Sequence, residues 1–481
     1  MVAVIGLRDT LSAIFDALRL PVLAYFVAIN TGYLIIICLA GLEFRRHLRR
    51  QAFAGSEQAL SSPLTPGASI IVPAYNEQAG ITVAVKAMLA LRYPTHEVVV
   101  VDDGSTDETY RRLCDEFDLV EIPRVIPQEI PVRATVISVA VPRDGRTPLV
   151  VIRKTNSGRS EAINVGINAA RMPLVAMVDA DSILDPDALL VVSKPFLDDP
   201  LRTIATGGVI RAANGCRVVA GRVTDVRMPR GWTARIQVIE YLRAFLLGRT
   251  GWSRLRSLIL ISGAFGLFRR DVVVAAGGLD PDCIGEDFEL VMRIHRAMRR
   301  RRRAYRVVFV AEPVSWTEVP STLAVLARQR RRWHRGLWEV LWKYRGMTGN
   351  PRYGRIGLFA LPYYWLFELL APVLELAGLV LIPLGLISGL VNVRYAISFV
   401  LVAYVYAILV ALVALCIEEF SFHRYHRWRD LGVALLACVA ENFGYRQLTA
   451  WWRVQGLAAA LARRKQVWGT MTREGFDTGD A

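Results

Sequence analysis

The sequence predicts an open α/β sheet that is flanked by membrane segments. From residue 69 to about residue 310, short β-branched runs alternate with helix-like stretches, as in parallel sheets buried on both faces. Uncharged apolar runs of membrane-spanning length lie on both sides of this region. Carboxylates follow two of the β-branched runs, at 102–103 and 179–181. Since ligands bind beyond the carboxyl ends of such strands, these acids mark the expected site.

The first element is expected to anchor the chain in a membrane. Residues 1–20 mix apolar and charged residues and could form an amphipathic helix, and 21–42 is an uncharged apolar run of spanning length. A cleaved signal peptide is the alternative, but basic, bulky residues follow the run instead of a small-residue cleavage site. This first unit is taken as 1–50, and a Ser-, Pro- and Gly-containing linker follows over 51–67.

The α/β unit is expected over 68–320. Its strands are expected at 70–72, 98–101, 150–152 and 174–178. Its helices are expected between them, at 79–91, 107–117, 159–170 and 185–197. Alternation of strand and helix along a chain is typical of this architecture, because the helices cover the faces of the sheet.

The C-terminal third is expected to return to the membrane. Residues 321–345 are basic and Trp-rich with apolar residues at helical spacing, which predicts a helix in the membrane interface. A second interfacial helix is expected at 356–367, so that 321–367 forms one interface unit. Membrane spans are expected at 368–390 and 396–417.

Residues 431–460 leave two topologies open. A full span would place the basic residues 463–465 outside the cell, against the positive-inside rule. A re-entrant or in-plane element is therefore favoured. It would close a membrane region at 368–460, and a cytoplasmic tail would follow at 461–481.

The charge pattern indicates a membrane partner. The 59 Lys and Arg residues exceed the 43 Asp and Glu residues by a net charge of +16. Arginines gather beside the apolar runs, at positions 45, 46, 49 and 50 and at 424, 427 and 429. The positive-inside rule places both clusters in the cytoplasm, so we expect an integral inner-membrane protein with lipid contacts and no nucleic-acid partner. The six cysteines form no CxxC pair and the six histidines have no ligand spacing, which argues against disulfides and a zinc site.

The first two motifs are expected to hold a nucleoside. A strand that ends near Pro73 leads into a turn with Tyr75 and Glu77, which could approach a nucleobase. A plain strand-to-helix loop is the alternative. Asp102 or Asp103 could accept hydrogen bonds from uracil or ribose. The residues after this pair could equally be just a helix cap.

Asp179 and Asp181 are expected to bind a divalent cation. At positions i and i+2 of a strand, the two carboxylates would point to the same side and repel unless a cation lay between them. Hard oxygen ligands suit Mg²⁺ or Mn²⁺, which would share the phosphates of a nucleotide-sugar. A solvated loop before a capped helix is the alternative.

Arg159 and Asp287 are candidates for two further roles. Arg159 follows a glycine at a helix start, where a phosphate contact is natural, although it could simply pair with Glu161. Asp287 opens a helix and is a candidate general base for an acceptor hydroxyl. The small-residue loop at 262–266 could leave room for that acceptor. Compensation of the helix dipole by Glu286 and Asp287 is the alternative.

Gln329, Arg332 and Trp333 complete the set. Their spacing of three and four residues places them on one helix face. Arg332 could hold phosphate with its planar fork, and Trp333 could stack on an acceptor sugar. The alternative is an interfacial helix whose Trp and Arg residues only anchor to lipid.

Taken in order, these motifs resemble those of the membrane-bound family-2 glycosyltransferases, the group of the cellulose, chitin, hyaluronan and poly-N-acetylglucosamine synthases. The resemblance covers roughly residues 68–345. It lies in the nucleotide-binding segments 72–77 and 102–105, the DxD motif 179–181, the Thr-Glu-Asp motif around 286–287 and the QxxRW motif 329–333. It implies a GT-A-like Rossmann-type nucleotide-sugar domain, a UDP-sugar donor, Mg²⁺ or Mn²⁺, and inverting transfer with Asp287 as base and Glu286 contacting substrate.

The chain departs from the family pattern at three places. Gly285 stands where threonine or serine is common, and Arg159 stands where lysine is common. Residues 120–150 lengthen the distance between the second and third motifs and could form a hairpin that shapes the acceptor site.

The resemblance implies sugar transfer to a growing polysaccharide. Single addition to a membrane lipid, as in ceramide glucosyltransferases, is the alternative. Three expected spans are few for a polysaccharide channel, so a partner subunit or a homo-oligomer could complete one. A third hypothesis is a catalytically silent scaffold that merely binds a nucleotide or polymer.

Overall fold

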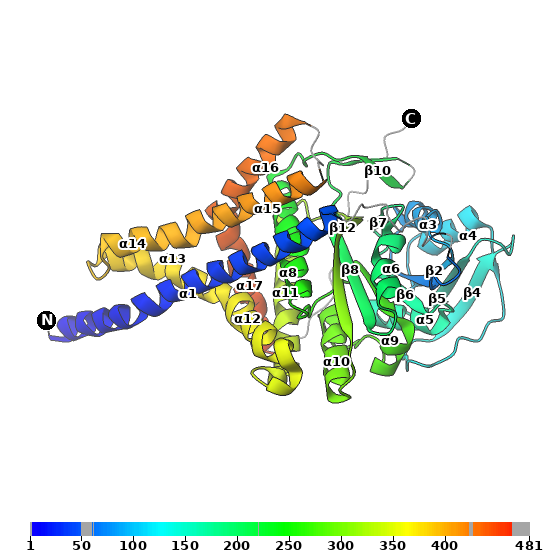
Figure 1. Ribbon diagram of the computed structural model, residues 1–481, viewed down its shortest axis with the longest axis horizontal. Coiled ribbons are helices and arrows are strands. Elements are labelled where there is room, and N and C mark those ends of the chain that lie inside the picture. The colour runs from blue at the N-terminus through cyan, green and yellow to red at the C-terminus, as the bar shows by residue number, and fades with distance from the viewer. Residues whose placement is uncertain (1, 50–59, 61, 220, 423–426, 464–481) are drawn as a thin grey trace.

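A ten-stranded mixed sheet organises the middle of the chain, and long helices extend from one side of it (Figure 1). The computed structural model describes residues 2–49, 60, 62–219, 221–422 and 427–463. Most of the expected linker, Arg50 and Arg424 of the basic clusters, and the tail beyond residue 463 lie outside the described residues.

The strands of the sheet are β1 (Ala68–Ala74), β2 (His96–Asp102), β3 (Leu119–Glu121), β4 (Val136–Pro142), β5 (Leu149–Lys154), β6 (Leu174–Val178), β7 (Ile183–Leu184), β8 (Thr203–Ala212), β11 (Phe265–Arg269) and β12 (Arg306–Thr317). A separate hairpin contains β9 (Arg217–Val219) and β10 (Arg222–Asp225). The helices around the sheet are α3 (Ile81–Leu89), α4 (Thr109–Phe117), α5 (Arg159–Ala169), α6 (Ala188–Asp198), α7 (Trp232–Tyr241), the π-helix η1 (Leu242–Gly248), α8 (Arg249–Arg254), α9 (Arg270–Ala276) and α10 (Glu286–Arg300).

The remaining helices belong to the N-terminus and to the C-terminal third. They are α1 (Val2–Arg49), α11 (Leu323–Lys343), η2 (Arg345–Met347), η3 (Pro351–Tyr353), η4 (Ile356–Ala360), α12 (Leu361–Tyr363), η5 (Tyr364–Leu369), α13 (Ala371–Ile387), α14 (Val393–Val400), η6 (Leu401–Val405), α15 (Tyr406–Phe422), α16 (Trp428–Ala440), η7 (Glu441–Tyr445) and α17 (Arg446–Leu461).

The four expected strands form the parallel part of the sheet. β1 pairs in parallel with β2 and β6, and β2 pairs in parallel with β5, so their carboxyl ends meet at one edge. The chain moves outward from β1 to β2 on one side, and β6 lies on the other side, which makes a topological switch point where ligands bind. The sheet is not parallel throughout, because β11 runs antiparallel to both β6 and β8.

The expected extra hairpin widens the sheet at one edge. β3 pairs antiparallel with β4, and β4 pairs antiparallel with β5. The segment between β3 and β4 returns toward α5 and α10. Within it, the Ile130 backbone N–H donates to Asn168 Oδ1 at 2.9 Å, and Arg133 pairs with Asp282 at 2.8 Å.

Among the described residues, three helical stretches are long and apolar enough to cross a membrane: Leu20–Phe44, Ile356–Ile387 and Val393–Phe420. α1 continues unbroken through Pro21, so the helix expected at 1–20 and the first span form one element. The stretch 356–367 is not a separate interfacial helix, because helical structure continues through η4, α12 and η5 toward α13 and opens the second candidate span.

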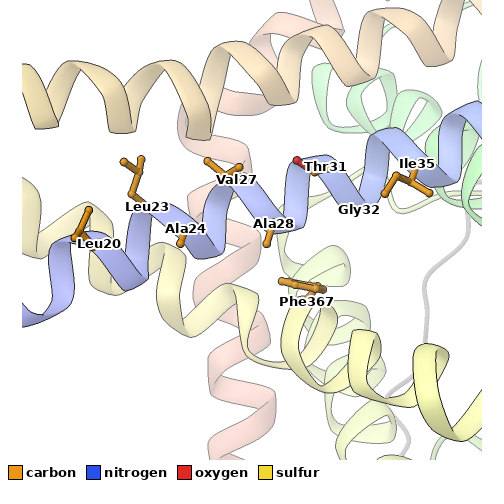
Figure 2. A pocket seen from close by; sticks show the side chains of 9 residues that line it. All are labelled: Leu20, Leu23, Ala24, Val27, Ala28, Thr31, Gly32, Ile35 and Phe367. Atoms are coloured by element: carbon orange, nitrogen blue, oxygen red, sulfur yellow. The ribbon is translucent and has the colours of Figure 1, made fainter.

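An apolar hollow of about 730 Å³ lies along α1 (Figure 2). Its lining side chains come from α1 between Leu20 and Ile35, together with Phe367 of η5, and Thr31 is the one hydroxyl residue among them. No carboxylate lines the hollow. It therefore belongs to the apolar surface of a candidate span and not to the expected site.

The last two helices, α16 and α17, lie outside the three candidate spans. The chain bends between them at Phe443 and Gly444, and Gly444 has φ +84°, a conformation that glycine adopts without strain. α17 packs along α11, across the direction of the candidate spans (Figure 1). The in-plane or re-entrant placement of 431–460 stays a prediction.

We expect Gly166→Ala to destabilise the protein. A Cβ at Gly166 in α5 would lie 2.3 Å from Ile71 Cγ2 of β1. This overpacking should cost about 1–3 kcal/mol, more than the roughly 1 kcal/mol that alanine gains in helix propensity. The matched control is Gly432→Ala, because a Cβ at this helical glycine would meet nothing within 4 Å. Thermal unfolding in detergent should show a lower Tm for the first variant only, and a raised Tm for both would contradict the packing argument.

Candidate active site

Four distant segments meet at the guanidinium of Arg159, which opens α5. Its Nε and Nη2 donate to Asp179 Oδ1 at 2.9 and 2.7 Å. Its Nη1 donates to Glu286 Oε1 at 2.7 Å, and Nη2 also donates to the Gly263 carbonyl at 2.8 Å. The start of α5, the turn after β6, the loop before β11 and the start of α10 are thereby joined.

The charges around Arg159 shift two pKa values. Burial lowers the pKa of Arg159, but the charges of Asp179 and Glu286 raise it by more, so the guanidinium stays protonated. Glu286 is only 6% exposed, and its burial raises its pKa despite the opposing effect of Arg159. The cation therefore partly offsets the desolvation of the acid beside it.

Asp287 is oriented by backbone donors at the start of α10. Its Oδ2 accepts from the Gly263 N–H at 2.9 Å, and its Oδ1 accepts from the Phe288 N–H at 2.7 Å. An ionised carboxylate has about four acceptor sites, so capacity for a further proton donor remains. Gly263 thus contacts both Asp287 and Arg159. A Cβ at Gly263 would lie 3.0 Å from Arg159 Nη2, so the small-residue loop makes room for this arginine.

Arg332 of α11 belongs to the same electrostatic group. Burial lowers its pKa below the ordinary value, although the charges of Glu286, Asp179 and Asp287 act in the opposite direction. Its two expected companions differ in exposure. Gln329 is 8% exposed, whereas Trp333 is 42% exposed.

A glycine pair brings α10 and α11 together. A Cβ at Gly336 would lie 3.1 Å from the backbone nitrogen of Gly285, the residue before α10. A Cβ at Gly285 would in turn meet the Gly336 backbone at 3.4 Å. The glycine at 285, where a hydroxyl residue is common in the resembling family, therefore faces the backbone of α11. This close approach brings the start of α10, with Asp287, up to α11, which carries Arg332.

The two acids at the end of β2 have different partners. Asp103 accepts from the Ser157 and Gly158 N–H groups at 2.9 and 2.8 Å, and it pairs with Lys154, which is fully buried. Asp103 therefore holds the loop that leads into Arg159. Sequence reasoning missed the pairing of Lys154, although a lysine at the end of a buried β-branched run was its signal.

Asp102 keeps one acceptor atom spare. Its Oδ1 accepts from the Ser105 N–H at 3.1 Å, while its buried Oδ2 accepts no hydrogen bond from any described residue. Burial raises the pKa of this carboxyl. Of the two candidates for contact with a nucleoside, Asp102 is thus the one with unused capacity.

The turn after β1 lies against the loop after β2. Asn76, with φ +57°, accepts from the Thr106 N–H at 2.8 Å, and the Glu77 N–H donates to Thr109 Oγ1 at 2.8 Å. Tyr75 is 45% exposed, and Pro73 lies within β1 opposite Val101. The two expected nucleoside segments are therefore adjacent. Asn76 was missed as a structural residue, although asparagine is enriched at such left-handed positions.

Asp179 and Asp181 lie in a turn, not on a strand. β6 ends at Val178, and the Ser182 N–H donates to the Asp179 carbonyl at 3.0 Å. The alternation argument was therefore wrong in its geometry, because the chain has already left the sheet. No group of three or more His, Cys, Asp or Glu residues that could hold a metal occurs within the described ranges. The two carboxylates are hard oxygen donors, so a cation there would take its other ligands from phosphate or water.

Models of two related families match adjoining parts of the chain. The one described as "Glycosyl transferase family 2" matches residues 69–130, and the one described as "Glycosyltransferase like family 2" matches residues 131–336. Together they cover more than half of the chain and include every motif described above.

Curated relatives with similar sequences are polysaccharide synthases. The chain is 28% identical over 277 residues to the poly-beta-1,6-N-acetyl-D-glucosamine synthase of Staphylococcus aureus (strain COL), which is 57% of this chain and 55% of that protein. It is 25% identical over 280 residues to the synthase of the same name from Staphylococcus epidermidis. The chain thus spans about half the length of the curated relatives it matches.

Among solved structures, the fold is similar to that of the mannosyltransferase PcManGT from Pyrobaculum calidifontis, determined in complex with GDP-Man and Mn²⁺. The TM-score is 0.50 with 16% sequence identity, over 92% of this chain and 100% of that chain. This likeness concerns the fold alone and confirms the expected GT-A-like α/β architecture.

We expect Arg159→Gln to destabilise the protein by about 3 kcal/mol, because it leaves partly buried Asp179 and Glu286 without their cation. The matched control is Arg133→Gln. It breaks an ion pair whose two side chains are both 69% exposed and should cost less than about 1 kcal/mol. Thermal unfolding of both variants in detergent measures the difference. Equal Tm values would show that the buried cation is dispensable.

Proposed function

The chain belongs to glycosyltransferase family 2, and on that premise we propose that it moves a hexose from a UDP-sugar to a growing polysaccharide at the inner face of the cell membrane. Transfer would invert the anomeric centre. The observation that carries the proposal is the meeting of Asp179, Glu286, Asp287 and Arg332 around Arg159. The printed name of the curated relatives supports a polymer product and makes UDP-N-acetylglucosamine the first donor to test.

Asp287 is the proposed general base. It takes the proton from the acceptor hydroxyl, whose oxygen attacks the anomeric carbon as the bond to the UDP oxygen breaks. One displacement of this kind inverts the centre. The transition state resembles an oxocarbenium ion, as in glycoside cleavage. The backbone N–H groups of Gly263 and Phe288 hold the carboxylate in place for the proton transfer.

The donor is proposed to lie along the carboxyl ends of the parallel strands. The spare oxygen of Asp102 accepts a hydrogen bond from the nucleoside, and Pro73, Tyr75 and Glu77 form the adjoining wall. Asp103 acts indirectly, by holding the loop before Arg159.

Cations stabilise the departing diphosphate. Arg332 offers a buried planar fork, which suits phosphate. Arg159 already binds two carboxylates, so its phosphate contact requires one of them to be exchanged. Mg²⁺ or Mn²⁺, held by Asp179 and Asp181, would supply further neutralisation of the leaving group when bound.

The acceptor is proposed to stack on the half-exposed ring of Trp333, with Gln329 and Glu286 nearby. A single addition to a membrane lipid is the second candidate. The small membrane portion favours it, since three candidate spans occur among the described residues. A partner subunit or a second copy would be needed if three spans cannot enclose a polymer.

Product size decides between the two. Purified protein in detergent is incubated with a panel of UDP-sugars and Mg²⁺ or Mn²⁺, and UDP release and product length are measured. We expect a ladder of long products, whereas a single glycolipid would support the lipid acceptor. No UDP release with any donor would contradict sugar transfer.

Asp287→Asn should lower transfer by about 10²- to 10⁴-fold, because the amide cannot take the proton. UDP binding should be unchanged. The control is Asp282→Asn, which alters an exposed acid four residues before the start of α10. Loss of UDP binding together with activity would contradict the role as base, and full activity would favour the silent scaffold.

Asp181→Ala should weaken Mn²⁺-dependent UDP binding by at least about tenfold, since even groups that only support metal ligands contribute that much. Titration calorimetry with and without Mn²⁺ measures the effect. Asp187→Ala is the control, because this acid pairs with Arg92 at the surface. Equal UDP affinity in both conditions would reject the metal assignment.

A further inference from the structure

The acceptor helix α11 is held along its length by α17. Trp452 of α17 packs against Leu326 of α11. Further along, Gly456 approaches so closely that a Cβ there would lie 2.4 Å from the Arg331 carbonyl oxygen. A C-terminal helix therefore forms one wall behind the QxxRW segment.

A single carboxylate joins these two helices to α7. Glu240 Oε2 accepts from Arg330 of α11 at 2.6 Å and from the Tyr445 hydroxyl at 2.8 Å. The ion pair is well shielded, with side-chain exposures of 12% for Arg330 and 20% for Glu240. Burial lowers the pKa of Arg330, but the charge of Glu240 raises it by more, so the pair stays ionised.

Arg330 in turn supports the exposed tryptophan. Its guanidinium carbon lies 4.9 Å from the centroid of the Trp333 ring. Residues three apart share a helix face, so this contact is built into α11. A desolvated cation–π contact is worth up to about 2 kcal/mol, and it restricts the ring while leaving it 42% exposed.

We propose that Glu240 is a positioning residue for the acceptor site. By fixing Arg330, it sets the orientation of Trp333 and so controls the stacking of the acceptor sugar. The inference rests on the proposed function, because that function assigns the acceptor to Trp333. It assigns Glu240 no contact with substrate. The donor side of the site should therefore be indifferent to its charge.

The test uses Glu240→Gln in the full chain, which keeps the size of the side chain and removes its charge. With an oligosaccharide of β-1,6-linked N-acetylglucosamine as acceptor, KM for the acceptor should rise about tenfold, the loss expected for a hydrogen bond to a charged group. KM for UDP-N-acetylglucosamine and the UDP release without acceptor should stay within about twofold. A merely structural role would not separate the two substrates.

A double-mutant cycle identifies the route. If Glu240 acts through Trp333, adding Glu240→Gln to Trp333→Phe should change the acceptor KM by less than about twofold, because coupled residues are not additive. Additive effects would overturn the proposal.

The matched control is Glu43→Gln. It removes a 2.7 Å ion pair with Arg254 that also joins a membrane helix to the catalytic half, but away from α11. The acceptor KM of this variant should equal that of the wild type.

The outcomes separate the inference from the function beneath it. A wild-type protein that transfers no sugar overturns the proposed function. A wild-type protein that transfers sugar, with a Glu240→Gln variant of equal acceptor KM, overturns the inference alone. A parallel rise in both KM values would make Glu240 a structural residue.

Discussion

The candidate site depends on one buried cation held between carboxylates. Arg159 contacts Asp179, Glu286 and the Gly263 carbonyl with three nitrogen atoms. Without that charge, acids from two different elements would meet in a region with little solvent to screen them. The planar fork also explains why arginine serves here where lysine is common in the family. A single ammonium group could not reach these acceptors in the same fixed geometry.

The local pattern of the sequence predicted the fold well. The run at 174–178 matches β6 residue for residue, and the helix expected at 321–345 is found at Leu323–Lys343. These elements are set by burial within a short window, which periodicity reports directly. The antiparallel placement of β11 was not predictable in this way, because it depends on which strands become neighbours after the chain has folded.

The site was predictable in its members but not in its contacts. The acids and the QxxRW residues converge as expected, yet the turn at 179–181, the Asp103–Lys154 pair and the role of Glu240 were missed. Each of these depends on partners far away in sequence; Glu240 and Arg330, for example, are separated by 90 residues. Spacing rules apply within a helix or strand, so they carry no information about such pairs.

The two ends of the sheet have a consequence for the molecule in a crowded membrane. The outermost strands are very short, with three residues in β3 and two in β7. An exposed strand edge is a template on which a second chain can add its own strand. These truncated borders offer few free backbone groups for such growth. Ten strands can thus remain in one molecule without seeding fibres or tangling with nascent neighbours, so any self-association would have to use other surfaces.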